Sequence, residues 1–477
     1  MPRQADGGRG SQGSVAAALA DAQALIRAGR PADAVDALER LTVESPRDPA
    51  AWVALGVARA MLSRHAEAID ASSRAVALAP RAPGVQLAHG DVLRVSGRIG
   101  AARRAYAAAV ELAPNDADGL NKLAGIERIE RDFDAAQAHL DRALALAPAH
   151  PYVQVNLATL AVERAQVGVA RRRLSDALRL PRLPREAADE AAATLAMLDE
   201  HDALAPAIER SRVEGSPAAI EAALRMRGEP SRRDEYWVAA LEQVIERTLR
   251  EAPIDDAFAR GRPASARWPA IEAHHNFRRL GKEDAIPRTI ELVASGRADP
   301  EAREVRDYAD VVARRGASLA FADGIAGEAW LRHAHACMAA SRPEYFPGQV
   351  KPVNNLLHSD PPVSRPAPLD VAGTLRTAMS RIDAALPPGA WRACLRYCAI
   401  IEIHPFRDGN GRLARHLLNR SLESVGLFPC LRPGNDDEEL ARRYSLARRE
   451  RDMRDVAAWF ADASRYAADL DARWSAR

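Results

Sequence analysis

The chain has 477 residues, which is enough for two or three domains with sizeable cores. Its 67 basic and 65 acidic residues leave a formal charge of only +2, so bulk charge does not favour a nucleic-acid-binding protein. No apolar run reaches the roughly 18 residues that a membrane-spanning helix needs. Residues 1–14 lack the apolar segment of a secretory signal and are expected to form a disordered leader. The sequence therefore predicts a cytoplasmic protein, with export into a host cell as the alternative that it leaves open.

Residues 15–182 repeat with a period of 34 residues. Prolines recur at this spacing, and two series of small residues follow it in phase: Pro46, Pro80, Pro114 and Pro148, then Ala34, Ala68, Ala102, Ala136 and Ala170, then Ala75, Ala109, Ala143 and Ala177. Small residues let the two helices of a hairpin approach closely, and the proline ends the second helix. The clearest unit begins with Trp52, Leu55 and Gly56. The pattern resembles the tetratricopeptide repeat (TPR), and its period gives about five units. The resemblance implies a concave surface for a protein or peptide, and a dimerisation or spacer element is the alternative.

Residues 183–235 have a looser pattern, which we interpret as a helical cap and linker. A helix is expected at 186–199, and Pro206 and the Gly215–Pro217 turn interrupt the helical pattern after it. Residues 236–477 are expected to form the second domain. Helical spacing of apolar residues predicts its elements: 237–249, a helix around Glu272, 305–312, 329–338, 369–386, 438–451 and 456–470.

Residues 404–415 read His-Pro-Phe-Arg-Asp-Gly-Asn-Gly-Arg-Leu-Ala-Arg and lie between two helical patterns. The apolar face of 391–401 predicts a helix that ends at His404, because Pro405 disfavours helical backbone at the residue before it. A second helical pattern begins near Leu413. The Gly409–Gly411 stretch between them predicts a turn whose N–H groups converge at the start of the second helix, where anions bind.

The side chains of this stretch suit a nucleotide-dependent group transfer to a hydroxyl. Arg412 and Arg415 are three residues apart on one helix face, and two guanidinium groups suit a polyphosphate better than a single phosphate. Asp408 offers a hard oxygen ligand for Mg²⁺. His404 titrates near neutrality and is placed to take a proton from a hydroxyl nucleophile.

The stretch matches the pattern HPFx[D/E]GNGRxxR at every position, so the chain resembles a Fic-domain protein. The resemblance implies an all-α domain that transfers AMP from Mg-ATP to a Ser, Thr or Tyr hydroxyl of a target protein. It makes His404 the general base, places Phe406 beneath the loop and gives Mg²⁺ to Asp408. It assigns the donor phosphates to five further residues: Gly409, Asn410, Gly411, Arg412 and Arg415.

The family often carries an upstream inhibitory helix with the pattern [S/T]xxxE[G/N], whose Glu pairs with the second Arg of the motif. Glu272 has the matching position, although Trp268 replaces the Ser or Thr and Ala273 replaces the Gly or Asn. Near matches at Ser231–Glu235 and Glu214–Gly215, and a plain surface role for Glu272, stay open. On the inhibitory reading, Glu272→Gly should raise activity.

The family also has a β-hairpin flap that holds the target segment by main-chain pairing. We expect it at 347–355, where Pro and Gly interrupt the helical period, with Val350, Lys351 and Val353 as its residues. A plain surface loop is the alternative. Residues 359–368 are rich in proline and are expected to be a linker.

The sequence thus predicts an all-α chain with a TPR solenoid, a helical linker and a Fic domain with a short β-hairpin flap. The predicted activity is protein adenylyltransferase, with ATP and Mg²⁺ required and the repeats binding a target or partner. A homodimer is allowed for. Three alternatives stay open: a different donor such as UTP, GTP or CDP-choline, removal of AMP from the target, and a non-catalytic TPR adaptor.

Overall fold

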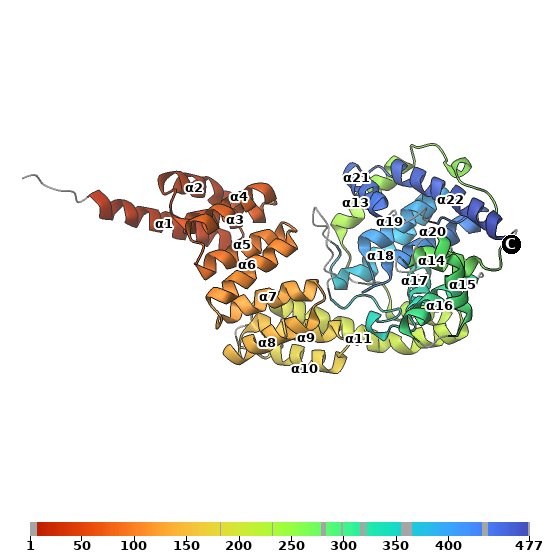
Figure 1. Ribbon diagram of the computed structural model, residues 1–477, viewed down its shortest axis with the longest axis horizontal. Coiled ribbons are helices and arrows are strands. Elements are labelled where there is room, and N and C mark those ends of the chain that lie inside the picture. Colours follow the sequence, from red (N-terminus) through yellow and green to blue (C-terminus); the bar gives the residue numbers. More distant parts are fainter. Residues whose placement is uncertain are drawn as a thin grey trace, which may run out of the picture. The chain divides into compact units, whose positions relative to one another are not determined.

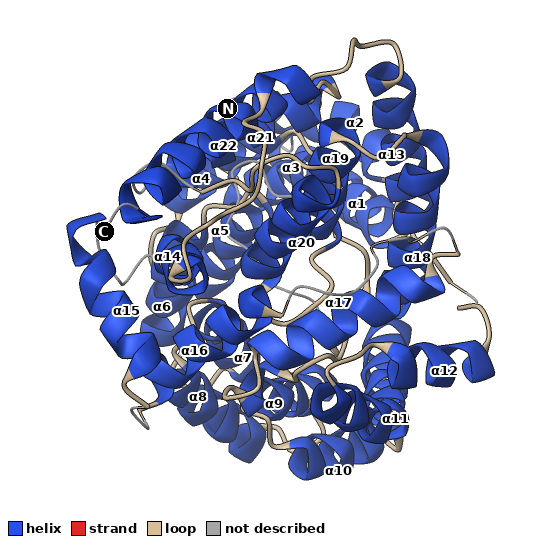
Figure 2. Cartoon of the chain, turned by 90° about the vertical axis from the view of Figure 1, so that its right-hand side faces the viewer, coloured by secondary structure: helices blue, strands red, loops and turns tan. Residues whose placement is uncertain are grey.

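The computed structural model describes residues 7–181, 183–230, 232–277, 283–296, 299–314, 319, 321, 323–353, 365–431 and 437–475. The described chain up to Ala192 belongs to one compact unit, and the described chain from Ala193 onward belongs to a second. Every regular element in these residues is a helix (Figures 1 and 2). The predicted all-α class is therefore confirmed.

The N-terminal unit contains five consecutive helical hairpins (Figure 1). Their helices are α1 (Gly7–Arg27) and α2 (Pro31–Glu44), α3 (Pro49–Met61) and α4 (His65–Leu78), α5 (Pro83–Val95) and α6 (Ile99–Leu112), α7 (Ala117–Ile129) and α8 (Phe133–Leu146), and α9 (Pro151–Glu163) and α10 (Val167–Leu178). The alanines of both periodic series are buried where helices meet, and each periodic proline follows a helix end by two residues. Helix α1 begins at Gly7, inside the segment expected to be a disordered leader.

Residues 183–230 are more than a linker. Helix α11 (Arg185–Glu214) continues beyond residue 199, where its end was expected, and contains Pro206, which was expected to interrupt the helical pattern. Helix α12 (Ala218–Arg227) follows. Apolar side chains of both helices share a buried cluster with helix α17 (Ile325–Met338): Leu204, Ile208, Ile220, Leu224, Ile325, Ala329 and Ala336. Burial of this apolar face stabilises the long helix and offsets the hydrogen bond that Pro206 removes.

The other helices of the C-terminal unit surround one core. They are α13 (Glu235–Thr248), α14 (Trp268–Asn276), α15 (Ile286–Ala294), α16 (Pro300–Ala313), α17, α18 (Pro368–Ala385), α19 (Ala390–Ile403), α20 (Asn410–Ser424), α21 (Asp437–Glu450) and α22 (Arg454–Ser475), with short 3₁₀ turns at Asp255–Ala257, Glu283–Ala285 and Pro343–Tyr345. Helix α15 was not predicted. Cys394 and Cys398 of α19 are buried in the core as free thiols.

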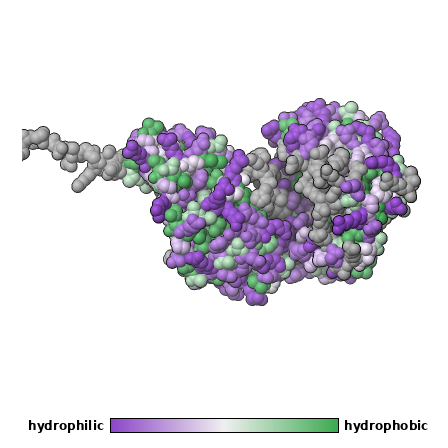
Figure 3. All heavy atoms as spheres, in the orientation of Figure 1, coloured by the Kyte–Doolittle hydropathy of each residue, from purple (hydrophilic) through white to green (hydrophobic). Residues whose placement is uncertain are grey.

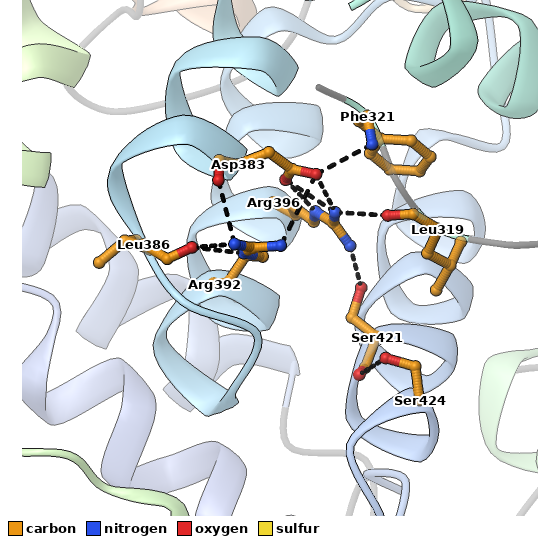
Figure 4. Close-up of polar contacts among 8 residues, drawn as sticks. All are labelled: Leu319, Phe321, Asp383, Leu386, Arg392, Arg396, Ser421 and Ser424. Atoms are coloured by element: carbon orange, nitrogen blue, oxygen red, sulfur yellow. Dashed lines mark hydrogen bonds and ion pairs between the residues drawn. The ribbon is translucent and has the colours of Figure 1, made fainter. Parts of the chain in front are cut away.

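Helices α18, α19 and α20 are joined by a buried arginine (Figure 4). Arg396 of α19 pairs with Asp383 of α18 at 2.6 Å and donates to Ser421 Oγ of α20 at 3.0 Å. It also donates to the carbonyl of Leu319 at 2.7 Å. A buried charge is stable only when it is paired and hydrogen-bonded, so this network fixes the two helices that flank residues 404–409.

The surface of the N-terminal unit mixes hydrophilic and hydrophobic side chains on the face seen in Figure 3. Among the described residues, no helix has both the length and the apolar character that crossing a membrane requires.

Candidate active site

His404 lies directly after α19, in the left-handed backbone region at φ 51° and ψ 60°. The prediction that the helix ends here is confirmed. Burial, followed by the charges of Arg365 and Lys351, lowers the pKa of His404 to about 3, so the imidazole is neutral at physiological pH. In the described part of the chain its Nδ1 atom is buried without a hydrogen-bond partner.

The loop after His404 is closed by Asn410 at the start of α20. The Asn410 side chain accepts from the N–H of Phe406 at 2.9 Å and donates to the Phe406 carbonyl at 2.7 Å. The Asn410 side-chain amide is thus buried and occupied within the loop, and the expected contact of its backbone N–H with phosphates stays a prediction. Gly409 has φ +80°, a conformation that glycine adopts without strain, and its N–H donates to Asp408 Oδ1 at 2.6 Å.

His335 on α17 packs against this loop, although no local pattern in the sequence marks it. Its ring stacks on Phe406 with centroids 4.1 Å apart and planes 11° apart. Nε2 donates to the carbonyl of Asp408 at 2.9 Å, and Nδ1 accepts from the N–H of Gly348 at 2.9 Å. Burial lowers the pKa of His335 to about 4, so it stays neutral and can both donate and accept.

Arg412 and Arg415 both lie close to the glycine turn. A Cβ atom built on Gly409 would be 3.7 Å from NH2 of Arg412, and one built on Gly411 would be 3.4 Å from NH1 of Arg415. Arg412 also pairs with Glu304 of α16, a partner that the sequence did not predict. The two guanidinium groups therefore flank the turn that was predicted to bind phosphates.

Glu272 is buried on α14, but its contacts differ from those expected. The carboxylate accepts from Trp268 Nε1 at 3.0 Å, from Tyr308 OH at 3.1 Å and from Asn419 Nδ2 at 3.0 Å. Burial, together with the charge of Glu423, raises its pKa to about 7.

The expected ion pair between Glu272 and Arg415 is absent from the contacts of the described residues. Arg415 Nε instead donates to Asn276 Oδ1, at the end of the same helix. Both carboxylate oxygens are instead bound by neutral donors. One of them is the indole N–H of Trp268, which lies one helical turn before Glu272 and replaces the expected Ser or Thr. The inhibitory role of Glu272 stays a prediction.

The expected β-hairpin flap is not found in the described residues. Val350 forms one isolated antiparallel bridge with Phe406, and the N–H of Lys351 donates to the Pro405 carbonyl at 2.8 Å. Val350, Lys351 and Val353 are all buried, so their side chains do not form an exposed target-binding edge. Residues 354–364, which include the rest of the expected flap and most of the expected linker, lie outside the described residues.

This segment is held by residues that no local sequence signal marks. His201 of α11 donates to the Val350 carbonyl at 2.7 Å, and Gln349 donates to the His201 carbonyl at 2.9 Å. Gly348 has φ +73°, and a Cβ there would lie 2.9 Å from the Arg332 carbonyl, so only glycine fits. The Pro and Gly punctuation that predicted a flap thus belongs to a tight turn packed against the site.

The side chains present fit Mg²⁺ only as a metal shared with a phosphate ligand. The described residues contain no group of three or more His, Cys, Asp or Glu side chains that could hold a metal. The Asp408 side chain remains 38% exposed at the glycine turn. A single carboxylate completed by phosphate oxygens and water is the arrangement that Mg²⁺ commonly adopts at nucleotide sites.

Comparisons with known proteins identify both parts of the chain. Residues 327–422 match the family model described as Fic/DOC family, and residues 19–83 and 87–151 match the model described as tetratricopeptide repeat. The Fic/DOC match includes residues 404–415 and most of α17, including His335. A search of the curated proteins gave no match.

Several solved TPR structures resemble part of the chain. The thermophilic TPR protein TTC0263 of Thermus thermophilus is 22% identical, with 38% of this chain and 99% of that chain covered and a TM-score of 0.36. MamA of Desulfovibrio magneticus is 20% identical, with 35% of this chain and 94% of that chain covered and a TM-score of 0.31. The protein pilF of Pseudomonas aeruginosa is 18% identical, with 43% of this chain and 93% of that chain covered and a TM-score of 0.35. From the two family matches, the chain is a Fic/DOC-domain protein with N-terminal tetratricopeptide repeats.

Proposed function

We propose that this protein is an adenylyltransferase that moves AMP from Mg-ATP to a hydroxyl side chain of a target protein. The Fic/DOC domain supports a transferase, and the repeats support a protein partner. The observation that carries the proposal is the placement of Arg412 and Arg415 against the two glycines of the turn at the start of α20. Two guanidinium groups at a helix N-terminus favour a polyphosphate ligand over an uncharged one.

In the proposed reaction, the target hydroxyl oxygen forms a bond to the α-phosphorus of ATP. The bond from that phosphorus to the oxygen bridging it to the β-phosphate breaks, and pyrophosphate leaves. The hydroxyl proton passes to His404, which is neutral and can accept it. Arg412 and Arg415 bind the leaving phosphates and stabilise the charge that develops on them. Asp408 would hold Mg²⁺, which would supply charge neutralisation at the donor phosphates.

The test is mass spectrometry of the purified full-length protein after incubation with Mg-ATP. Wild type should gain the mass of one AMP group, His404→Ala should gain none, and Glu272→Gly should gain more than wild type if Glu272 is inhibitory. UTP, GTP and CDP-choline serve as competing donors. Addition of another group would identify a different Fic transferase, and loss of AMP from a modified target would identify the reverse activity.

Donor binding separates a catalyst from a silent adaptor. His404→Ala should bind Mg-ATP as wild type does, since His404 acts on the hydroxyl proton and not on the phosphates. Arg415→Ala should weaken ATP binding more than AMP binding, and equal losses would argue against its contact with the outer phosphates. A wild type that neither binds nor uses any of these donors would favour the non-catalytic TPR adaptor.

A further inference from the structure

Glu304 is a buried carboxylate shared by two arginines. It lies on α16 with 2% of its surface exposed. Oε1 accepts from NH1 of Arg412, and Oε2 accepts from Arg342 Nε at 3.1 Å and NH2 at 2.9 Å. Burial alone would raise the pKa of Glu304, but Arg412 and Arg342 outweigh it and hold the pKa below its ordinary value. The carboxylate is therefore ionised and fixed through both oxygens.

These contacts fix the orientation of the Arg412 guanidinium. NH1 is held by Glu304, the flat face lies over the Phe277 ring at 5.0 Å, and NH2 is 3.9 Å from Asp408 Oδ1. NH2 also lies 3.7 Å from a Cβ built on Gly409. The terminal nitrogen that Glu304 does not hold thus lies beside the glycine turn. An arginine that is already ordered loses less conformational entropy when it binds a phosphate.

We propose that Glu304 is a positioning residue that orients Arg412 toward the outer phosphates of the donor, with Arg342 as the second cation that neutralises it. The inference rests on the proposed function. Among the described residues, Glu304 pairs with Arg412 and with Arg342, and the proposed effect on the donor passes through Arg412.

The competing reading is that Glu304 occupies Arg412 and must leave before a phosphate can bind. Two features favour positioning. Glu304 binds NH1 of Arg412, while NH2 of Arg412 lies beside the glycine turn. Its second oxygen is tied to Arg342, itself placed over the Tyr345 ring at 5.6 Å, so Glu304 is held in place independently of Arg412.

The experiment measures Mg-ATP and AMP binding by calorimetry, and KM and kcat of transfer, in the full-length protein. The variants are Glu304→Gln, Arg412→Ala and the double variant. The control is Glu344→Gln, because Glu344 contacts Arg342 at 3.4 Å in the same cluster and is more exposed. Glutamine has the shape of glutamate, and thermal melting verifies that each variant is folded.

We expect Glu304→Gln to weaken Mg-ATP binding by about tenfold, since a charge-assisted bond to a buried carboxylate is lost. KM for ATP should rise by a similar factor with a smaller change in kcat, and AMP binding should stay within about twofold because AMP lacks the outer phosphates. In the Arg412→Ala background the same substitution should have no further effect. Glu344→Gln should bind Mg-ATP as wild type does.

Unchanged or tighter Mg-ATP binding in Glu304→Gln would overturn the inference, and tighter binding would establish the competing reading. If Glu304→Gln weakened ATP and AMP binding equally, the effect would be a general structural one and the inference would be overturned. The same holds if Glu304→Gln weakened Mg-ATP binding in the Arg412→Ala background as much as it does in wild type. A wild type that binds no nucleoside triphosphate would refute the proposed function and this inference with it. A wild type that binds Mg-ATP, with Glu304→Gln unaffected, would refute this inference alone.

Discussion

Replacement of His335 by phenylalanine tests how residues 404–409 are held. Phenylalanine keeps an aromatic ring against Phe406, whose stacking distance to His335 is 4.1 Å. It removes both hydrogen bonds of the imidazole, the one donated to the Asp408 carbonyl and the one accepted from the Gly348 N–H. Both backbone groups would then face a hydrocarbon ring that can neither donate nor accept a hydrogen bond.

The expected loss follows from these two groups. Leaving a buried polar group without a partner costs about 1–3 kcal/mol, so the loss of both partners should lower the free energy of unfolding by roughly 2–6 kcal/mol. Because one of the bonds ends on Asp408, the loop should also shift at the glycine turn. Transfer activity should therefore fall by more than the unfolded fraction explains.

His416→Phe provides the matched control. His416 is also buried and stacked on an aromatic ring, Trp330, at 5.6 Å with planes 6° apart. Within the described residues, its Nδ1 atom has no hydrogen-bond partner, so the same substitution orphans fewer groups. Urea unfolding of both variants at neutral pH compares the losses. If His335→Phe lost no more stability than His416→Phe, the hydrogen bonds of His335 would not be what holds the loop.

Three further predictions concern buried groups. Burial raises the folded-state pKa of Glu272 to about 7, so the protonated carboxyl contributes its full stability below pH 4.5, and this contribution is lost as the pH rises through 7. Relative to Glu272→Gln, the free energy of unfolding of wild type should fall by up to roughly 3 kcal/mol over that range. Urea unfolding at several pH values measures the difference. Burial, followed by the charge of Arg365, lowers the pKa of Lys351 to about 7, so above that pH the unfolded chain binds more protons than the folded chain. The free energy of unfolding of wild type should therefore rise relative to Lys351→Met by about 1.4 kcal/mol per pH unit between roughly pH 7.5 and 9. Parallel stability profiles of the two proteins against pH would contradict the burial of this amine. In the repeats, a Cβ on Gly90 would overlap the Tyr106 ring, so Gly90→Ala should destabilise the N-terminal unit by about 1–3 kcal/mol in calorimetry, with less loss in a Tyr106→Leu background.

Local patterns in the sequence were enough for much of the fold. The 34-residue period predicted the five hairpins because each repeat buries the same small residues against its neighbour. The helices on either side of 404–409 were predicted because their apolar faces and Pro405 are local signals. Helix α11 was misjudged at Pro206, since burial against α17 overrides a local helix-breaking signal.

In the candidate site, too, some features were predictable from local sequence and others were not. His404, Asp408 and the glycines are contiguous in the chain, and their shared loop was predictable from residues 404–415 alone. The roles of Glu272 and the 347–353 segment were inferred by resemblance, and the structure gives Glu272 three neutral donors and buries the segment against residues 405 and 406.

The sequence by itself determined the repeat array and the all-α class, and it predicted the chemistry of the loop, because periodicity and contiguous motifs are properties of the chain. Only the tertiary structure decided which distant side chains contact that loop. His335 and Glu304 come from α17 and α16, 73 and 108 residues before the groups that they hold. Neither residue has a local signature. Their partners are set by how helices pack in the core, and that packing brings a buried histidine and a buried carboxylate to one glycine turn.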